Sequence, residues 1–286
     1  MSETAFGPTI LSRVLCGSSP FVGSSQFGSE GEKWLERFFD HPERMSALFN
    51  EFCRLGYPGA HVTGFPTVIE AVQLTREKYD LKVVASLLPF NWDENLEQVL
   101  VLNPEVVFIH GAMTDKFLEK RLDDLISCFE TIRNANSFPG LATHDTCHTL
   151  KVLRTEDNPL QDEIFGLLLP INKTGQLSGG TTKEMEDLLG TMDTRYPVMG
   201  MKTLASGKIP PCSSCTHCFG SALSHWSFKE GRNSQDLHVH PPIPSNSSNH
   251  LHSKNEYEPQ GQDHPLGIGF RTSSVAPALG HLGVVS

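Results

Sequence analysis

Long basic runs and long apolar runs are both missing from this sequence. Its 286 residues include 23 Lys and Arg against 33 Asp and Glu, which gives a formal net charge of −10. Nucleic acids and anionic membrane surfaces attract clustered basic side chains, so we expect neither as a partner. No stretch approaches the roughly 20 apolar residues that a membrane helix needs. Met1–Gly7 also lacks a signal-peptide pattern, and we expect a cytoplasmic protein.

Cysteine is sparse before residue 211. The four cysteines in this part of the chain share apolar surroundings. We interpret them as small buried side chains with reduced thiols, the usual state of cysteine in a cytoplasmic protein. They are Cys16, Cys53, Cys128 and Cys147.

Short apolar runs alternate with longer amphipathic stretches between residues 10 and 204. Strands that alternate with helices at this spacing pair in parallel through right-handed crossovers. An open doubly wound sheet fits this pattern, but short strands in seven consecutive units favour a (β/α)-barrel of the TIM type. We expect the strands at residues 10–16, 59–63, 81–87, 106–110, 140–143, 164–169 and 198–202.

The amphipathic stretches predict a helix after each of the first six strands. The first covers residues 30–56 with a break at Pro42. The clearest begins at Thr114, which stands where an N-cap belongs, and carries one apolar stripe with a period of about 3.6 residues. The stripe consists of Phe117, Leu118, Leu122, Leu125, Ile126, Phe129 and Ile132.

The composition changes after Pro211. Residues 212–286 hold eight of the thirteen histidines, many Ser, Asn, Pro and Gly, and no long periodic apolar segment. Such a segment buries too little apolar surface to offset the entropy of ordering it. We therefore predict a barrel domain at 1–211 and a mostly disordered tail at 212–286. We expect this barrel to lack a normal eighth βα unit. A different exon, a shifted reading frame or a gene-model error would each produce such a change of sequence.

The tail begins with three cysteines and a histidine, Cys212, Cys215, His217 and Cys218. Their spacing resembles part of an iron–sulfur motif, and a Cys₃His set is also a zinc-binding combination. The fourth iron–sulfur cysteine is absent, and His217 adjoins Cys218, which makes joint ligation awkward. We interpret the cluster as a chance grouping, and the sequence leaves the cofactor open.

Polar residues follow several predicted strands, where a barrel places its chemistry. His110 follows the fourth strand, His144 and Asp145 follow the fifth, and Lys202 ends the seventh. Histidine exchanges protons near neutral pH, and a carboxylate such as Asp145 could orient an imidazole. A lysine at a buried strand end could form a Schiff base or hold an anion. We expect these four as catalytic residues acting on a small carbonyl or phosphorylated metabolite.

The segment after the seventh strand could bind a phosphate. Barrels often hold phosphate in the loops after their last strands, with glycine-loosened backbone amides. Ser206, Gly207 and Lys208 are the candidate ligand-binding residues in this loop.

Two other functions stay open. The first is a metal-dependent lyase, isomerase or hydrolase that uses His61, His110 and His144, although no HxH or HxxxH spacing supports a metal site within one element. The second is a non-catalytic or truncated remnant, which the missing eighth unit makes plausible.

Three segments resemble uncharacterised TIM-barrel proteins related to the aldo-keto reductase superfamily. Leu15–Gly23 is similar to their first strand and loop, Phe108–Asp115 to their fourth strand and Gly200–Lys208 to their seventh. The resemblance covers about residues 10–211. It implies a (β/α)-barrel fold.

The aldo-keto reductases use a tetrad of Asp, Tyr, Lys and His beside a nicotinamide. The resemblance places only the histidine, at His110. Ala60–Gly64 stands where the family carries its Asp and then its Tyr, and Ser86 stands where the Lys is expected. The resemblance therefore implies the fold rather than the activity.

We predict that nicotinamide-dependent carbonyl reduction is absent or very slow, because protonating the developing alkoxide needs a donor with a tuned pKa. NADPH oxidation with a simple aldehyde measures it. Rapid oxidation that a change of His110 abolishes would contradict the prediction.

Overall fold

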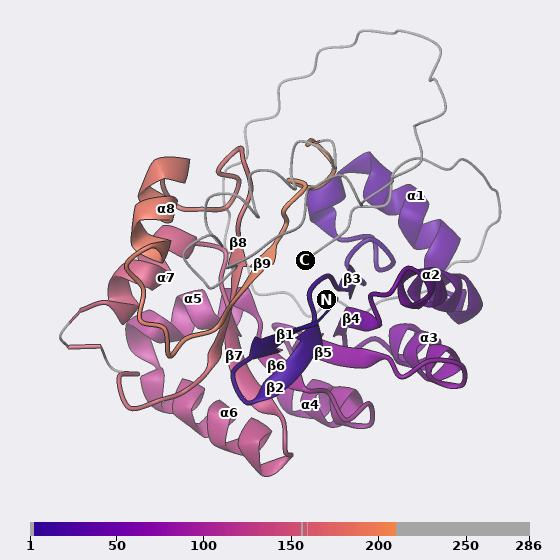
Figure 1. Ribbon diagram of the computed structural model, residues 1–286, viewed down its shortest axis with the longest axis horizontal. Helices are drawn as coiled ribbons and strands as arrows, with labels where there is room; N and C mark the ends of the chain where they lie inside the picture. The colour runs from indigo at the N-terminus through magenta and orange to yellow at the C-terminus, as the bar shows by residue number, and fades with distance from the viewer. Residues whose placement is uncertain (1–2, 156, 159, 210–286) are drawn as a thin grey trace, which may run out of the picture. The chain divides into compact units, whose positions relative to one another are not determined.

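Seven parallel strands form one sheet in the computed structural model, which describes residues 3–155, 157–158 and 160–209. The strands lie in chain order, and every neighbouring pair is parallel. The sheet forms a half-barrel whose edge strands are the first and the last (Figure 1). In order they are β3 (Cys16–Gly17), β4 (Gly59–Thr63), β5 (Lys82–Ser86), β6 (Val106–Ile109), β7 (Phe138–Ala142), β8 (Gly166–Pro170) and β9 (Val198–Met201).

Eight α-helices and one short 3₁₀ helix connect the strands in the described residues. Proline stands in the first turn of α2 and α3, where its fixed φ suits a helix start, and Pro42 separates α1 from α2 as predicted. None of the described helices is long and apolar enough to cross a membrane. They are η1 (Ser25–Phe27), α1 (Ser29–Phe38), α2 (Pro42–Arg54), α3 (Pro66–Arg76), α4 (Trp92–Leu100), α5 (Gly111–Lys120), α6 (Leu122–Asn134), α7 (Thr146–Leu153) and α8 (Thr182–Leu189).

The sheet is buried on both faces. In β6, Val107 and Ile109 belong to the large core that the helices share, while Val106 and Phe108 belong to a second core on the opposite face. All four side chains are fully buried. Such two-sided burial explains why the strands read as continuous apolar runs rather than as an alternating pattern.

A β-hairpin covers the amino ends of several strands on the second face. Its strands β1 (Glu3–Phe6) and β2 (Thr9–Ser12) pair antiparallel, and Gly7 turns between them with a φ of 59°. Phe6 meets the rings of Phe108 and Phe138 at centroid distances of 6.1 and 6.2 Å. Figure 1 shows this hairpin beside β6 and β7, the strands that carry Phe108 and Phe138.

The hairpin corrects the expectation of one strand at residues 10–16. The first part of that run belongs to β2, and only Cys16–Gly17 joins the parallel sheet. Sequence periodicity could not separate the two pieces because both are short and apolar.

The helix predicted to begin at Thr114 is also wrong in its start and its length. His110 is the N-cap of α5, and Thr114 lies buried inside that helix. The backbone leaves helical geometry at Arg121, with φ −145° and ψ 53°, so the apolar stripe is divided between α5 and α6. A ring nitrogen of histidine can accept a hydrogen bond from a backbone amide at a helix N-terminus, as a hydroxyl oxygen does. The sequence pattern favoured the hydroxyl of Thr114 and did not indicate the imidazole of His110.

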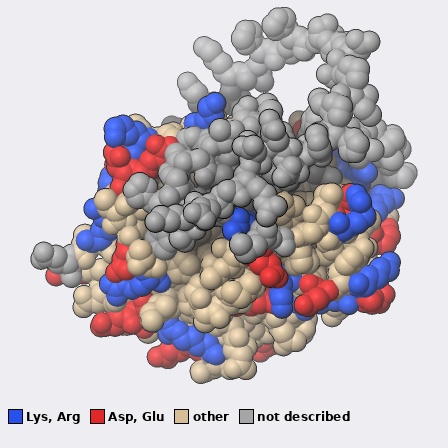
Figure 2. All heavy atoms as spheres, viewed as in Figure 1, with Lys and Arg blue, Asp and Glu red and all other residues tan. Residues whose placement is uncertain are grey.

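Charges of both signs lie interspersed on the described part of the face that Figure 2 shows. The predicted tail and its cysteine cluster, at 212–286, lie outside the described residues.

We predict that Phe6→Ala lowers the free energy of unfolding by about 3 kcal/mol or more, because it removes an aromatic side chain from a closed core. Ile10→Ala, in the same hairpin but 52% exposed, is the matched control and should cost less than about 0.5 kcal/mol. Urea denaturation measures both variants. Equal effects would show that the hairpin does not close the core.

Candidate functional site

Polar side chains gather at the carboxyl ends of β6 and β7, at the opposite end of these strands from the hairpin. His110 directly follows β6 and begins α5. Thr143, His144 and Asp145 follow β7 and lead into α7. Since parallel strands end at the same edge of a sheet, His110 and His144 become neighbours, with ring centroids 5.4 Å apart.

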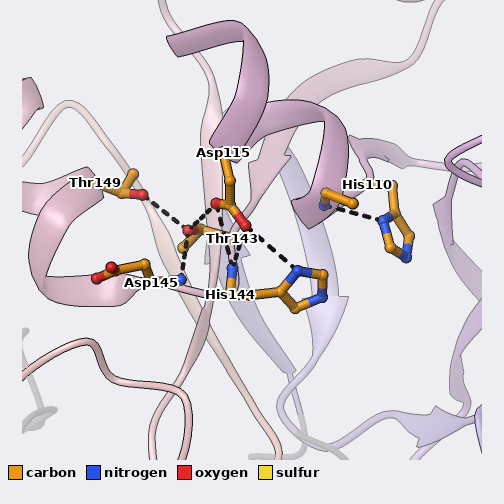
Figure 3. Close-up of polar contacts among 7 residues, drawn as sticks. His110, Asp115, Thr143, His144, Asp145 and Thr149 are labelled. Atoms are coloured by element: carbon orange, nitrogen blue, oxygen red, sulfur yellow. Dashed lines mark hydrogen bonds and ion pairs between the residues drawn. The ribbon is translucent and has the colours of Figure 1, made fainter. Parts of the chain in front are cut away.

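Asp115, on the second turn of α5, holds His144. His144 Nδ1 lies 3.4 Å from Asp115 Oδ2, and the backbone amide of His144 donates to the same oxygen at 3.2 Å (Figure 3). The His144 and Asp115 side chains are 36% and 32% exposed, so the pair is open to a ligand. A proton on Nδ1 that faces Asp115 leaves Nε2 of a neutral His144 as a base.

The Asp115 carboxylate is stabilised in its charged form. Burial by itself raises its pKa, but hydrogen bonds from His144 and Thr143 outweigh burial, and the pKa lies below its ordinary value. Thr143 Oγ1 donates to Asp115 Oδ1 at 2.6 Å and accepts from Thr149 Oγ1 and from the amide of Asp145. This chain of bonds fixes the carboxylate that orients His144.

His110 is held as a neutral imidazole. Burial, then the neighbouring His144 and Lys202, lower its pKa to about 4, against a smaller raising effect of Asp115. Its Nδ1 accepts from the backbone amide of Ala112 at 3.1 Å. The accepting nitrogen carries no proton, so the proton of the neutral ring is on Nε2.

The two imidazoles therefore have complementary hydrogen-bonding character. His110 presents an Nε2–H donor, and His144 presents an Nε2 acceptor. Gly111 permits their approach, because a Cβ at this position would lie 2.8 Å from Cε1 of His144.

Lys202 directly follows β9, an edge strand that lies two places beyond β7 in the sheet. Burial lowers its pKa, while the charge of Asp115 acts in the opposite direction. The charge of Lys202 is also among the causes that lower the pKa of His110.

The predicted role of Asp145 does not match its position. Its Oδ1 accepts from the amide of His148 at 2.9 Å, which makes Asp145 the N-cap of α7. The residue that orients His144 is Asp115, which sequence reasoning missed. Asp115 is five residues beyond His110 and inside a helix, so strand ends alone did not indicate it.

His61 lies in a different set of contacts. Its Nε2 is 2.8 Å from Ser86 Oγ, and its ring packs edge-on against Phe108 at 6.4 Å. Burial lowers the pKa of His61 to about 4, so this half-buried histidine is a neutral side chain beside Phe108 of the second core.

A metal triad is not formed by His61, His110 and His144. Within residues 3–209, apart from the undescribed positions 156 and 159, no group of three or more His, Cys, Asp or Glu is placed to hold a metal ion.

The predicted phosphate loop has few free amides. Ala205, Ser206 and Gly207 all have positive φ, and the amides of Gly207 and Lys208 donate to the carbonyls of Leu204 and Ala205. Ser206 Oγ is buried and has no hydrogen-bond partner within the described part of the chain. A phosphate would rely on this hydroxyl and the exposed Lys208 rather than on a cradle of amides.

An open groove of about 500 Å³ lies between α7 and α8. Its lysines, Lys151 and Lys183, are paired with Glu184 and Asp187. No predicted site residue lines it, so we assign the candidate site to the strand ends instead.

The sequence matches no protein-family model, and no curated protein is detectably similar to it. The chemical assignment therefore depends on the geometry of the site.

We predict that the free energy of unfolding decreases as pH falls from 6.5 towards 4. Over this range the unfolded chain binds protons that folded His61 and His110, with pKa values lowered to about 4, do not bind. His61→Gln should reduce the decrease by about 1 kcal/mol or more. Denaturation at several pH values measures it, with His148→Gln, on an exposed position of α7, as the control. An unchanged slope in His61→Gln would contradict the assignment.

Proposed function

We propose that this protein is an enzyme that performs acid–base chemistry on a small carbonyl compound at the carboxyl ends of β6, β7 and β9. The observation that carries the proposal is the pairing of an imidazole donor, His110, with a carboxylate-held imidazole acceptor, His144. A phosphorylated carbonyl compound fits the same chemistry. Its phosphate would bind to Ser206 and Lys208, in the segment that follows β9.

The two histidines have separate roles in this proposal. His144 Nε2 removes a proton from the carbon next to the carbonyl, and Asp115 stabilises the imidazolium that results. His110 Nε2–H donates to the carbonyl oxygen, where negative charge develops. A neutral imidazole at a helix N-terminus is suited to this role, since it donates a hydrogen bond without being charged.

Metal-dependent chemistry has less support from the arrangement of the side chains. His61 is engaged with Ser86 and with the Phe108 ring, rather than turned towards His110 and His144. The donor set that remains is two histidines and one carboxylate that is already hydrogen bonded to Thr143.

We also propose that the half-barrel belongs to a (β/α)-barrel related to the aldo-keto reductases. The order of the seven strands, their parallel pairing and the outer helices support this relation. The partner in this view is a small molecule, and the mixed charges of the face in Figure 2 do not favour a nucleic acid.

We predict that the protein accelerates exchange of the protons next to a carbonyl group for deuterium in D₂O, measured by NMR on pyruvate and glyceraldehyde. His144→Gln should slow this exchange by about 100-fold or more, since a positioned base contributes at least this much. Asp115→Asn should also slow it, because His144 loses its charged partner.

Two comparisons make the test specific. His148→Gln changes an exposed histidine on α7, the helix that follows His144, and should leave the rate unchanged. Asp145→Asn keeps the cap of α7, since Asn accepts the same hydrogen bond. If Asp145→Asn slows proton exchange more than Asp115→Asn does, Asp145 rather than Asp115 orients His144. Equal exchange rates in all variants would refute the proposed function.

A further inference from the structure

Lys202 differs from the other lysines in its surroundings. It directly follows β9, is half-buried, and has no carboxylate of the described residues within ion-pair distance. The lysines that are paired with carboxylates on the surface are Lys33, Lys82, Lys151 and Lys183. The described lysines without such a pair, Lys78, Lys116, Lys173 and Lys208, are exposed.

The backbone holds Lys202 in an uncommon conformation. Its φ of 57° lies in the left-handed region, which a residue with a long side chain seldom adopts. Its carbonyl accepts the amide of Ala205 at 2.8 Å, which secures the turn, and the flanking residues Met201 and Thr203 are buried. Positions of this kind occur where the surrounding structure fixes a functional side chain.

We propose that Lys202 is a nucleophile that forms a Schiff base with a small carbonyl compound held beside His110 and His144. This inference rests on the proposed function, because both concern the same ligand. The neutral amine is the nucleophilic form of lysine. Half-burial without a close carboxylate stabilises this form relative to the charged one, and it lowers the pKa of Lys202.

The step balances without an oxidant or a reductant. The lone pair on Lys202 Nζ attacks the carbonyl carbon, and the electrons of the C=O bond move to the oxygen. Proton transfers convert that oxygen to water, which leaves as the C=N bond forms. The protonated imine then withdraws electrons from the neighbouring C–H bond, whose proton passes to His144 Nε2.

Reductive trapping tests the inference. The full chain is incubated at pH 7 with pyruvate or glyceraldehyde and sodium cyanoborohydride, which reduces the C=N bond to a stable secondary amine. Peptide mass spectrometry then locates the label. Lys183 is the internal reference, because its ion pair with Asp187 raises its pKa and keeps the amine protonated. The lowered pKa of Lys202 increases its neutral fraction, and the proposed site holds the carbonyl compound beside this amine. We therefore expect Lys202 to be labelled at least about ten times faster than Lys183.

Matched variants connect the label to the chemistry. Lys202→Arg keeps the positive charge but cannot form an imine, and it should slow proton exchange on pyruvate by about tenfold or more. Lys183→Arg should leave that exchange unchanged. Thermal denaturation of Lys202→Arg checks that the variant is folded.

The outcomes separate this inference from the proposed function. Labelling of Lys202 no faster than Lys183 overturns the Schiff base. If exchange still depends on His144 and Asp115 in that case, the acid–base function stands. If Lys202 is labelled preferentially but His144→Gln does not change the rate of proton exchange, the Schiff base is supported and the proposed roles of the histidines are refuted. If Lys202 is still labelled preferentially in the His144→Gln variant while proton exchange in that variant is slow, both the Schiff base and the acid–base function are supported.

Discussion

The parallel sheet is buried on both faces, and this burial determines where polar side chains can stand. The helices cover one face, and the β1–β2 hairpin closes the second core at the amino ends of the strands. Strand interiors are therefore apolar, with exceptions such as the His61–Ser86 pair, which is satisfied by its own hydrogen bond. Side chains that carry chemistry are left to the carboxyl ends, where the chain turns into the helices.

The candidate site follows from where two strands end and how the next helices begin. His110 follows β6 and caps α5, so one ring nitrogen accepts from the amide of Ala112 and the other is available to donate. Asp115 returns from the second turn of the same helix to hold His144 from the neighbouring strand. Gly111 makes the contact possible, since any side chain there would occupy the space of the imidazole.

Most of the sheet could be predicted from the sequence because buried parallel strands are short apolar runs with clear limits. The run at residues 59–63 is an example, since it coincides with β4. The hairpin could not be predicted, because its second strand continues almost directly into β3 and no pattern marks the change of partner. The break at Arg121 was equally hidden, since the apolar stripe continues across it.

The positions of His110, His144 and Lys202 after strands can be read from the amino-acid sequence, because an apolar run that ends in a polar residue shows where a buried strand ends. The carboxylate that contacts His144 is known only from the three-dimensional arrangement of the helices and strands. Asp145 is adjacent in sequence, but the start of α7 turns its side chain to the amide of His148. Asp115 is distant in sequence, but the pairing of β6 with β7 places α5 beside His144. Hydrogen bonding depends on direction and distance in space, and neither is a function of separation along the chain.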